Sequence, residues 1–305
     1  MRGNPHLNIM EKYDIKVDIV LASYNGEKFI KEQVQSILAQ THSNFNLIIS
    51  DDNSSDKTKE IVEGLREVDN RIQVVNNNGI KGVVGNFNNG LKYTTSNYIM
   101  FSDQDDYWLN DKVEKMLALI VDNEGDEPAL AFSDLEVVDQ NLVTIHKSYY
   151  ISNSLSPINN TKSQFLLWRS TCYGCSVIFN RRLFSSAGLV PDYASMHDHW
   201  YAYNASILGK VLYHPDATIK YRQHDNNVVG SHDTGLLSKL LRIKKTFKSI
   251  KKNVISTSNT VKEINGINDI SLRRKLSFIK YNILSFSKER RLYCFVFVIL
   301  WVVYG

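Results

Sequence analysis

The chain has few cysteines, and this limits the ways in which it can be stabilised. Its 305 residues include only three, Cys172, Cys175 and Cys294, which are too few for a disulfide framework. Cys172 and Cys175 form one C-x-x-C pair, but no second pair and no nearby histidine accompany it, so we expect no zinc site. Reduced cysteines that pack in the interior are typical of a cytoplasmic protein.

Other missing signals exclude further classes of protein. Residues 1–11 contain no apolar run of the kind found in a secretory signal peptide, so we expect the body of the protein to remain in the cytoplasm. The sequence has neither a G-x-G-x-x-G motif nor a Walker lysine motif, which argues against dinucleotide-binding and P-loop proteins. Hydrophobic residues make up 43% of the chain and charged residues 22%, which excludes disordered and collagen-like chains.

Charge is present in both signs but is unevenly distributed. The whole chain has a formal net charge of +4. Between Lys239 and Arg291 there are fifteen lysines and arginines and only three acidic residues, a local balance of +12, so the rest of the chain carries −8. An acidic body with a basic tail indicates two functions in two places.

Apolar residues are concentrated at the C-terminal end. Residues 294–304 are uniformly apolar and directly follow the basic cluster 288–291. This segment is too short to span a bilayer, which requires about 20 apolar residues. Either it packs on the protein core, or it attaches the chain to an anionic membrane surface, which the basic cluster, Trp301 and Tyr304 favour. Basic clusters also serve nucleic-acid binding, but the apolar end favours a membrane, and we expect no nucleic-acid partner.

The first 121 residues alternate between strand and helix patterns. We expect strands at 17–22, 47–49, 72–75 and 98–101, and helices at 30–38, 58–65, 87–93 and 111–121. Strands separated by helices of this length form βαβ units and a parallel sheet. After residue 130 the pattern weakens, and we expect a strand at 175–179, a helix at 198–208, a hairpin of 211–213 with 218–221, and basic helices over 236–283.

These patterns predict an α/β fold with a mostly parallel, Rossmann-like sheet flanked by helices and a basic helical C-terminal extension. We expect a catalytic domain over residues 1–230, with one half at about 15–121 and the other at 122–230. Residues 231–305 form the C-terminal region.

Polar clusters follow three of the expected strands, at residues 22–26, 51–55 and 102–106. In open parallel sheets ligands bind beyond the carboxyl ends of the strands, so these clusters share the ligand-binding edge. The third cluster places Asp103, Asp105 and Asp106 within four positions, and neighbouring carboxylates raise the pKa of one another. A Mg²⁺ or Mn²⁺ ion would relieve the repulsion, although a solvated acidic loop or a helix start is the alternative.

The other two clusters are also ambiguous when taken alone. Residues 51–56 are typical of a capped helix start, but a carboxylate there also suits the imide of a nucleobase. Tyr24 in the first cluster is able to stack on such a base.

Three stretches in this order make the pattern specific: Val-Asp-Ile-Val-Leu-Ala-Ser-Tyr-Asn-Gly at 17–26, Ile-Ile-Ser-Asp-Asp-Asn-Ser-Ser-Asp at 48–56, and Phe-Ser-Asp-Gln-Asp-Asp-Tyr-Trp at 101–108. Together they resemble the family-2 inverting glycosyltransferases of GT-A fold, and most of all the bacterial members, including rhamnosyltransferases, that assemble O-antigen, capsule and rhamnan. Weaker likeness continues to about residue 230 through 174–175, 197–200 and 221–224.

The resemblance implies roles for the nucleotide-binding residues. Asp52 would read the base, Tyr24 would stack on it, and the backbone of Ala22 would contact it. Asp103-Gln104-Asp105 matches the D-x-D motif, in which Asp105 would bind a Mn²⁺ or Mg²⁺ ion and Asp103 would face the ribose.

Further along the chain, the resemblance assigns the catalytic base to Asp198, which lies in His-Asp-His-Trp. It places His224 at the metal or diphosphate, although Asp225 stands where the family more often has glycine. Lys81 is expected either to approach the diphosphate or to be an ordinary exposed lysine.

Five residues near these motifs are expected to contact the sugar or the acceptor: Trp108, Gly174, Cys175, His199 and Trp200. For Trp108 and Trp200 the alternative is that the rings seal the core. For His199, and for His197 on the other side of Asp198, the alternative is a polar surface residue.

The predicted function is inverting transfer of a sugar from a UDP- or dTDP-linked donor to a lipid-linked or growing surface-polysaccharide acceptor. Such a single displacement requires a base on the acceptor hydroxyl and charge neutralisation on the departing diphosphate. The basic, apolar-ended tail would hold the enzyme peripherally at the cytoplasmic face of the bacterial inner membrane.

Two alternatives use the same parts. A sugar-phosphate nucleotidyltransferase would carry a glycine-rich loop after the first strand, which residues 22–26 do not supply. A non-catalytic module that binds nucleotide sugars would be expected to have lost its acids, yet Asp52, Asp103, Asp105 and Asp198 are all present.

Overall fold

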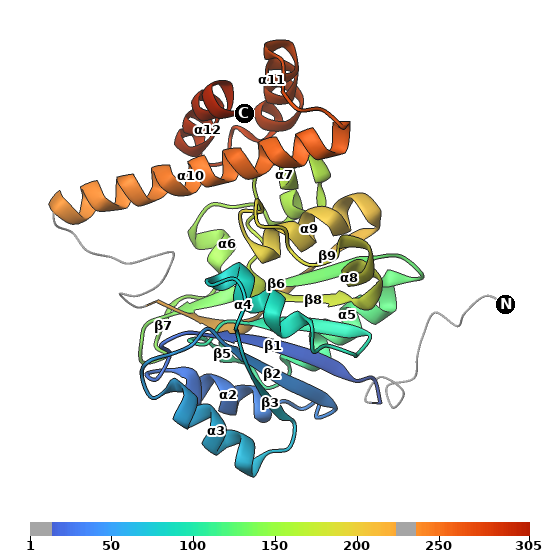
Figure 1. Cartoon of the computed structure of the whole chain (residues 1–305), viewed down its shortest axis with the longest axis vertical. Coiled ribbons are helices and arrows are strands. Elements are labelled where there is room, and N and C mark those ends of the chain that lie inside the picture. Colours follow the sequence, from blue (N-terminus) through green and yellow to red (C-terminus); the bar gives the residue numbers. More distant parts are fainter. Residues whose placement is uncertain (1–13, 224–235) are drawn as a thin grey trace.

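The computed structural model describes residues 14–223 and 236–305. Its strands are β1 (Val17–Ser23), β2 (Phe45–Asp51), β3 (Ile72–Asn76), β4 (Tyr98–Ser102), β5 (Tyr107–Trp108), β6 (Ala129–Val138), β7 (Thr144–His146), β8 (Val177–Asn180) and β9 (Lys210–Arg222). Within the described residues they form one sheet in the order β3-β2-β1-β4-β8-β6-β9-β5, with β7 paired to β6 (Figure 1).

Helices cover the sheet and build a separate layer at the C-terminal end. The longer ones are α2 (Ile30–Leu38), α3 (Thr58–Val68), α4 (Val83–Leu91), α5 (Lys112–Glu124), α9 (His197–Leu208), α10 (Leu236–Asn265) and α12 (Arg291–Tyr304). The shorter ones are α6 (Tyr149–Ser152), α7 (Ser163–Leu166), α8 (Arg181–Ala187) and α11 (Leu272–Phe278), with single turns η1 (Pro157–Thr161), η2 (Gly174–Ser176), η3 (Ile279–Ile283) and η4 (Leu284–Phe286). The predicted α/β class with flanking helices is confirmed.

The first half of the sheet is parallel. β1 pairs with β2 and β4, and β2 pairs with β3, all in parallel. Strands β1, β2 and β4 are almost entirely buried, as expected of parallel strands that carry helices on both faces. Figure 1 shows α2 and α3 on one side of them and α4 on the other. Because the strands run the same way, the residues after β1, β2 and β4 meet at one edge.

Helix α4 lies unusually close to the sheet because of its small and amide residues. A Cβ atom on Gly90 would come within 2.5 Å of Val20 Cγ1, so only glycine permits this contact. The buried Asn86 side chain donates to the Ser23 carbonyl over 3.0 Å and accepts from the Ser50 hydroxyl over 2.7 Å. These bonds fix α4 to the ends of β1 and β2.

The second half of the sheet mixes directions, and one prediction about it is wrong. Residues 211–213 and 218–221 do not form a hairpin, because both belong to the single strand β9, which pairs in parallel with β6. The register shifts between the pair Ser133↔His214 and the pair Asp134↔Ala217, so Pro215 and Asp216 form a bulge. A bulge needs one or two extra residues in the same strand, whereas the dipeptide reads as a turn in the sequence alone.

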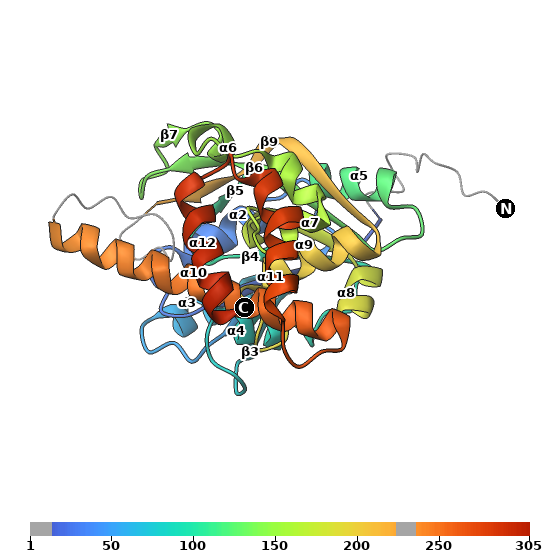
Figure 2. The ribbon, with the colours of Figure 1, turned by 90° about the horizontal axis from the view of Figure 1, so that it is seen from above.

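The C-terminal helices pack on the second half of the body, as Figures 1 and 2 show. Phe165 and Trp168 share a buried cluster with α10 and α12, to which those helices contribute Ile250, Val254, Cys294, Phe297, Leu300 and Trp301. Arg169 and Glu289 form a largely buried ion pair at 3.4 Å between the two parts. No helix in the described ranges combines the length and apolar character needed to cross a membrane.

Candidate functional site

A cavity of about 960 Å³ opens at the edge of the sheet where β1, β2 and β4 end. Eight of the residues predicted for the site line it: Ala22, Tyr24, Asp52, Lys81, Asp103, Asp105, Gly174 and Asp198. They come from positions up to 176 residues apart, so the fold brings together residues whose motifs are separate in the sequence.

On the side of the cavity beside β2, the Asp52 carboxylate is already hydrogen-bonded within the chain. Asp52 accepts from the Asn77 side chain at 2.8 Å and from the Gly82 backbone N–H at 2.7 Å. Lys81 Nζ lies 3.6 Å from the same carboxylate. Asp52 therefore ties the end of β2 to the loop before α4, with its side chain at the cavity wall.

Gln104, the middle residue of the D-x-D stretch, has a role that the sequence did not reveal. Its amide donates to the Tyr24 carbonyl at 3.0 Å and accepts from the Tyr24 backbone N–H at 2.8 Å. A Cβ atom on Gly26 would lie 2.3 Å from the Gln104 side-chain oxygen. The glycine of the first motif is thus needed for this bridge. Tyr24 itself is 57% exposed and lines the cavity.

Behind the cavity the acidic loop encloses a buried lysine. Lys112, the first residue of α5, is 0% exposed, donates to the Cys175 carbonyl at 2.5 Å and lies 4.4 Å above the Trp108 ring. Burial lowers the pKa of Lys112 to about 8, while Asp106 and Asp103 favour its charged form. The lysine places a positive charge under the acids.

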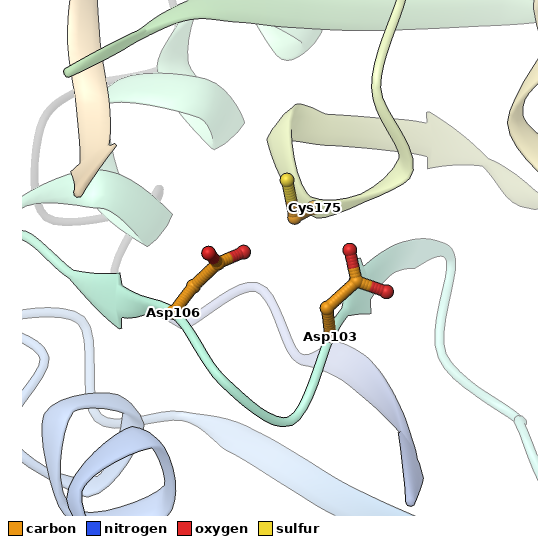
Figure 3. A group of neighbouring side chains, drawn as sticks. All are labelled: Asp103, Asp106 and Cys175. Atoms are coloured by element: carbon orange, nitrogen blue, oxygen red, sulfur yellow. The ribbon is translucent and has the colours of Figure 1, made fainter. Parts of the chain in front are cut away.

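Asp103, Asp106 and Cys175 form a cluster whose side chains point toward one another (Figure 3). Their possible ligand atoms lie within 4.8 Å of one another. Asp106 and Cys175 are almost fully buried, and a thiol is a poor ligand for Mg²⁺ or Mn²⁺. Asp106 also accepts from the Arg222 backbone N–H at 3.0 Å. We therefore interpret Asp106 and Cys175 as the support of the loop, and the cavity side as the place for a hard cation.

The carboxylates at the cavity are electrostatically strained. Burial, together with the negative charges of Asp105 and Asp198, raises the pKa of Asp103 to about 7. Oxygen ligands gathered beside like charges are what a hard divalent cation neutralises. The residues facing the cavity thus fit such an ion.

Asp198 lies in the first turn of α9 and lines the cavity, where its charge acts on Asp103. Its carboxylate accepts from the Gly174 backbone N–H at 3.0 Å and from the His199 backbone N–H at 2.6 Å. Burial nevertheless raises its pKa to about 6. A fixed carboxylate with a pKa near neutrality is suited to accept a proton.

His197, for which the sequence left two interpretations, is buried and also lines the cavity. Its ring stacks on Phe87 at 3.9 Å between centroids and meets the edge-on ring of Phe101 at 4.9 Å. The alternative of a polar surface residue is therefore wrong for His197.

Four predicted residues do not line this cavity. Trp108 and Cys175 lie beneath the acidic loop and are buried. His199 and Trp200 line a small separate cavity beside Ser256 of α10. His224 lies outside the described residues. We do not include these five in the substrate contacts proposed below.

Part of the chain matches a known family and relatives of known name. Residues 18–186 match the model of the family "Glycosyl transferase family 2". The chain is 34% identical over 130 residues to the UDP-Glc:alpha-D-GlcNAc-diphosphoundecaprenol beta-1,3-glucosyltransferase WfgD of Escherichia coli, which covers 43% of this chain and 49% of WfgD. It is 28% identical to the dTDP-rhamnosyl transferase RfbG of Shigella flexneri over 70% of this chain and 74% of RfbG.

Solved structures share the fold over most of the chain. S. aureus TarS 1-349 in complex with UDP-GlcNAc superposes with a TM-score of 0.57 at 16% identity, over 91% of this chain and 74% of the TarS 1-349 chain. Glucosyl-3-phosphoglycerate synthase of Mycobacterium tuberculosis, in complex with Mn²⁺, UDP and glucosyl-3-phosphoglycerate, gives a TM-score of 0.54 at 16% identity, over 88% of each chain. The chain spans about half the length of WfgD. The family match covers more than half of the chain, so this protein belongs to glycosyl transferase family 2.

Proposed function

We propose that this enzyme transfers a sugar from a UDP- or dTDP-linked donor to a lipid-linked or growing polysaccharide acceptor, with inversion at the anomeric carbon. The observation that supports this most is the division of one cavity between Asp52 on one side and the pair of Asp103 and Asp198 on the other. The relatives WfgD and RfbG are named for a UDP-sugar and a dTDP-sugar respectively, so both nucleotides are candidates.

In the proposed complex the nucleotide lies over the ends of β1 and β2. Tyr24 stacks on the base through its exposed ring, Asp52 accepts from the base imide, and the backbone of Ala22 contacts the base. Lys81, 3.6 Å from Asp52, approaches the diphosphate. Asp103 faces the ribose.

Asp105, with Asp103 beside it, would hold a Mn²⁺ or Mg²⁺ ion on the cavity side of the loop. A bound divalent cation neutralises charge on the departing diphosphate. The chain's own part is to hold these carboxylates at the end of β4, with the buried Lys112 and Asp106 supporting the loop from behind.

Asp198 acts as the base. It removes the proton of the acceptor hydroxyl while the acceptor oxygen forms a bond to the anomeric carbon and the bond from that carbon to the diphosphate oxygen breaks. The proton ends on Asp198, and the electron pair leaves with the nucleoside diphosphate. The N–H groups of Gly174 and His199 keep the carboxylate oriented for this transfer.

A donor screen tests the proposed activity. Purified protein with Mn²⁺ is incubated with UDP-glucose, UDP-N-acetylglucosamine or dTDP-rhamnose, with and without a bacterial membrane-lipid extract, and released nucleotide is measured. We expect release from one donor, increased by the extract and lost in Asp198→Asn. Absence of release from every donor, with and without extract, would contradict the proposal.

We also propose that α11 and α12 rest on an anionic membrane surface, which would place the enzyme at the cytoplasmic face of the bacterial inner membrane. One face of α12 packs on α10 through Phe297 and Trp301, but its other face is exposed: Leu292, Phe295, Ile299, Val302, Val303 and Tyr304. Figure 1 shows both helices at the top of the view, above the rest of the body. Apolar side chains in an interfacial helix enter the lipid boundary.

The unpaired side-chain charges of residues 271–305, which surround this face, are all positive. Residues 271–305 contain seven lysines and arginines, and their one acid, Glu289, pairs with Arg169. Exposed basic residues such as Arg273 and Arg274 attract anionic lipid. The same surface would bring the cavity to a lipid-linked acceptor.

Vesicle sedimentation tests this surface. We expect the wild type to bind vesicles of phosphatidylcholine with phosphatidylglycerol and not vesicles of phosphatidylcholine alone. Phe295→Ser with Val303→Ser should release the protein, and the control Ile151→Ser, which changes a side chain 82% exposed on α6, should not. Equal binding by all variants, or none by the wild type, would exclude this surface.

A further inference from the structure

His197 is a buried histidine with no hydrogen-bond partner for either ring nitrogen. The residue is 2% exposed, and both Nδ1 and Nε2 are unpaired. A buried polar atom without a partner costs free energy of folding, so such a group in a native protein requires an explanation. The nearest explanation is a partner that arrives with a ligand.

Two aromatic rings and a glycine hold the His197 ring in a fixed position. Phe87 stacks against one face at 3.9 Å, and Phe101 lies edge-on at 4.9 Å. On the remaining side the neighbour is Gly174, where an added Cβ atom would come within 2.4 Å of Nε2. Aromatic packing therefore fixes the ring at the cavity wall, and only a glycine at position 174 leaves room for Nε2, which is itself buried.

A second histidine in the same helix shows the hydrogen bonding that is expected of a histidine with a structural role. His199 Nδ1 lies 3.0 Å from the Ser195 hydroxyl, and its Nε2 lies 2.5 Å from the Leu166 carbonyl. Both nitrogens are paired, and the residue faces the separate small cavity. Two residues away, His197 lacks both partners and lines the main cavity, so its unpaired state is not general to this helix.

The chemistry of the ring selects the type of group it can bind. Burial lowers the pKa of His197 to about 3, so the imidazole is neutral near pH 7. A neutral imidazole offers one donor and one acceptor, which matches a hydroxyl group, whereas a diphosphate is best met by charged donors. The position next to the proposed base is also where the transferred sugar must lie.

We propose that His197 is a specificity-determining residue that hydrogen-bonds one hydroxyl group of the transferred sugar. This inference rests on the proposed function. A site built to pair with a hydroxyl group rejects an analogue that lacks it, because the buried partner is then left unpaired. His197 would thus distinguish donor sugars by the presence or orientation of that hydroxyl.

The test combines a variant with deoxy donors. His197→Phe keeps the aromatic packing but removes both nitrogens, and His197→Gln keeps a neutral donor and acceptor. The probes are the donor that the wild type uses fastest among UDP-glucose, UDP-N-acetylglucosamine and dTDP-rhamnose, its monodeoxy analogues, and UDP or dTDP alone. His42→Gln, a buried histidine bonded to the Ile15 carbonyl at 2.9 Å, is the matched control.

We expect His197→Phe to lower kcat/KM for the full donor by about 10- to 100-fold, the cost of one unpaired buried partner. For one deoxy analogue, the one that lacks the hydroxyl bound by His197, wild type and His197→Phe should have equally low kcat/KM. For the remaining analogues, His197→Phe should lower kcat/KM by the same factor as for the full donor. His197→Gln should recover part of the activity. Affinity for UDP or dTDP alone should stay within twofold, and Tm should stay or rise because two unpaired nitrogens are removed.

The possible results separate two failures. If the wild type uses none of the three donors, the proposed function itself fails, and the inference fails with it. If the wild type is active but His197→Phe discriminates among the deoxy analogues as the wild type does, the inference alone is wrong. The inference is also wrong if His197→Phe loses affinity for the free nucleotide. It is wrong as well if His197→Phe and His197→Gln both unfold at a lower temperature, because a structural role predicts these results.

Discussion

The two sides of the cavity are built differently. Beside β2, Asp52 is already paired with Asn77 and Gly82 at 2.8 and 2.7 Å. Beside α9 and the acidic loop, burial raises the pKa of Asp103 to about 7 and that of Asp198 to about 6, and His197 has no partner. On the first side Asp52 has hydrogen-bond partners without a ligand, whereas on the second side His197 has none and the carboxylates have raised pKa values.

This difference teaches how binding and reaction are separated in one cavity. Satisfied polar groups hold a loop in a fixed shape, which suits recognition of the unreactive nucleotide. Buried groups with perturbed pKa values cost stability and are concentrated where chemistry occurs. Substitutions on the first side should therefore change affinity, and substitutions on the second should change turnover.

The largest effect is expected for Asp198→Asn. The amide cannot take a proton from the acceptor, and a positioned general base contributes about 10²- to 10⁴-fold. We expect kcat to fall by that factor in an assay with radiolabelled donor, with the Kd for UDP unchanged. Asp192→Asn, an exposed carboxylate just before α9, is the control. Full activity in Asp198→Asn would remove this residue from the chemistry.

Removal of the divalent ion should have the next largest effect. Chelation with EDTA should lower turnover by about 100-fold, because charge on the diphosphate would no longer be neutralised, and Mn²⁺ or Mg²⁺ should restore it. Asp105→Asn should raise the Mn²⁺ concentration needed for half-maximal rate, whereas Asp126→Asn, whose side chain is fully exposed, should not. Undiminished turnover in EDTA would show that the acidic loop does not act through a metal.

Asp52→Asn should act on affinity. The change removes one acceptor for the base and weakens the bond from the Gly82 N–H, so we expect the Kd for UDP to rise about 10-fold, which corresponds to about 1.4 kcal/mol. Isothermal titration calorimetry measures the Kd, and saturating donor measures kcat. A fall in kcat at unchanged Kd would reverse the assignment of the two sides.

The smallest effect is the dependence of rate on pH. Asp198 acts when deprotonated, and burial raises its pKa to about 6. The rate should therefore be flat from pH 7 to 8 and fall about tenfold per unit well below pH 6. The residual activity of Asp198→Asn should lack this acidic limb. A limb that persists in the variant would have to belong to another group.

Much of the fold could be predicted from the sequence because the first half is local. Each strand is a short apolar run, each helix shows its own period, and parallel pairing then brings Asp52 and Asp103 to one edge. The bulge at Pro215 and Asp216 could not be predicted, because only pairing with β6 on both sides distinguishes it from a turn.

The site residues that lie in recognisable motifs could be predicted from the sequence. Those whose role depends on burial and tertiary contacts could not. Gln104, Lys112 and His197 each act through tertiary contacts with segments at least 63 residues away. The sequence held a weak signal for Lys112, a lysine at the start of a helix that directly follows the acidic loop. For the apolar tail, packing on the body is confirmed for one face of α12, and membrane attachment through the exposed other face stays a prediction.

The central claim is that one side of the cavity binds and the other reacts, and measuring both quantities in both variants tests it most directly. The Kd for UDP and the single-turnover rate at saturating donor are determined for Asp52→Asn and Asp198→Asn against the wild type. We predict that Asp52→Asn weakens affinity and keeps most of the rate, and that Asp198→Asn keeps affinity and loses the rate. Parallel loss of both quantities in both variants would contradict the account.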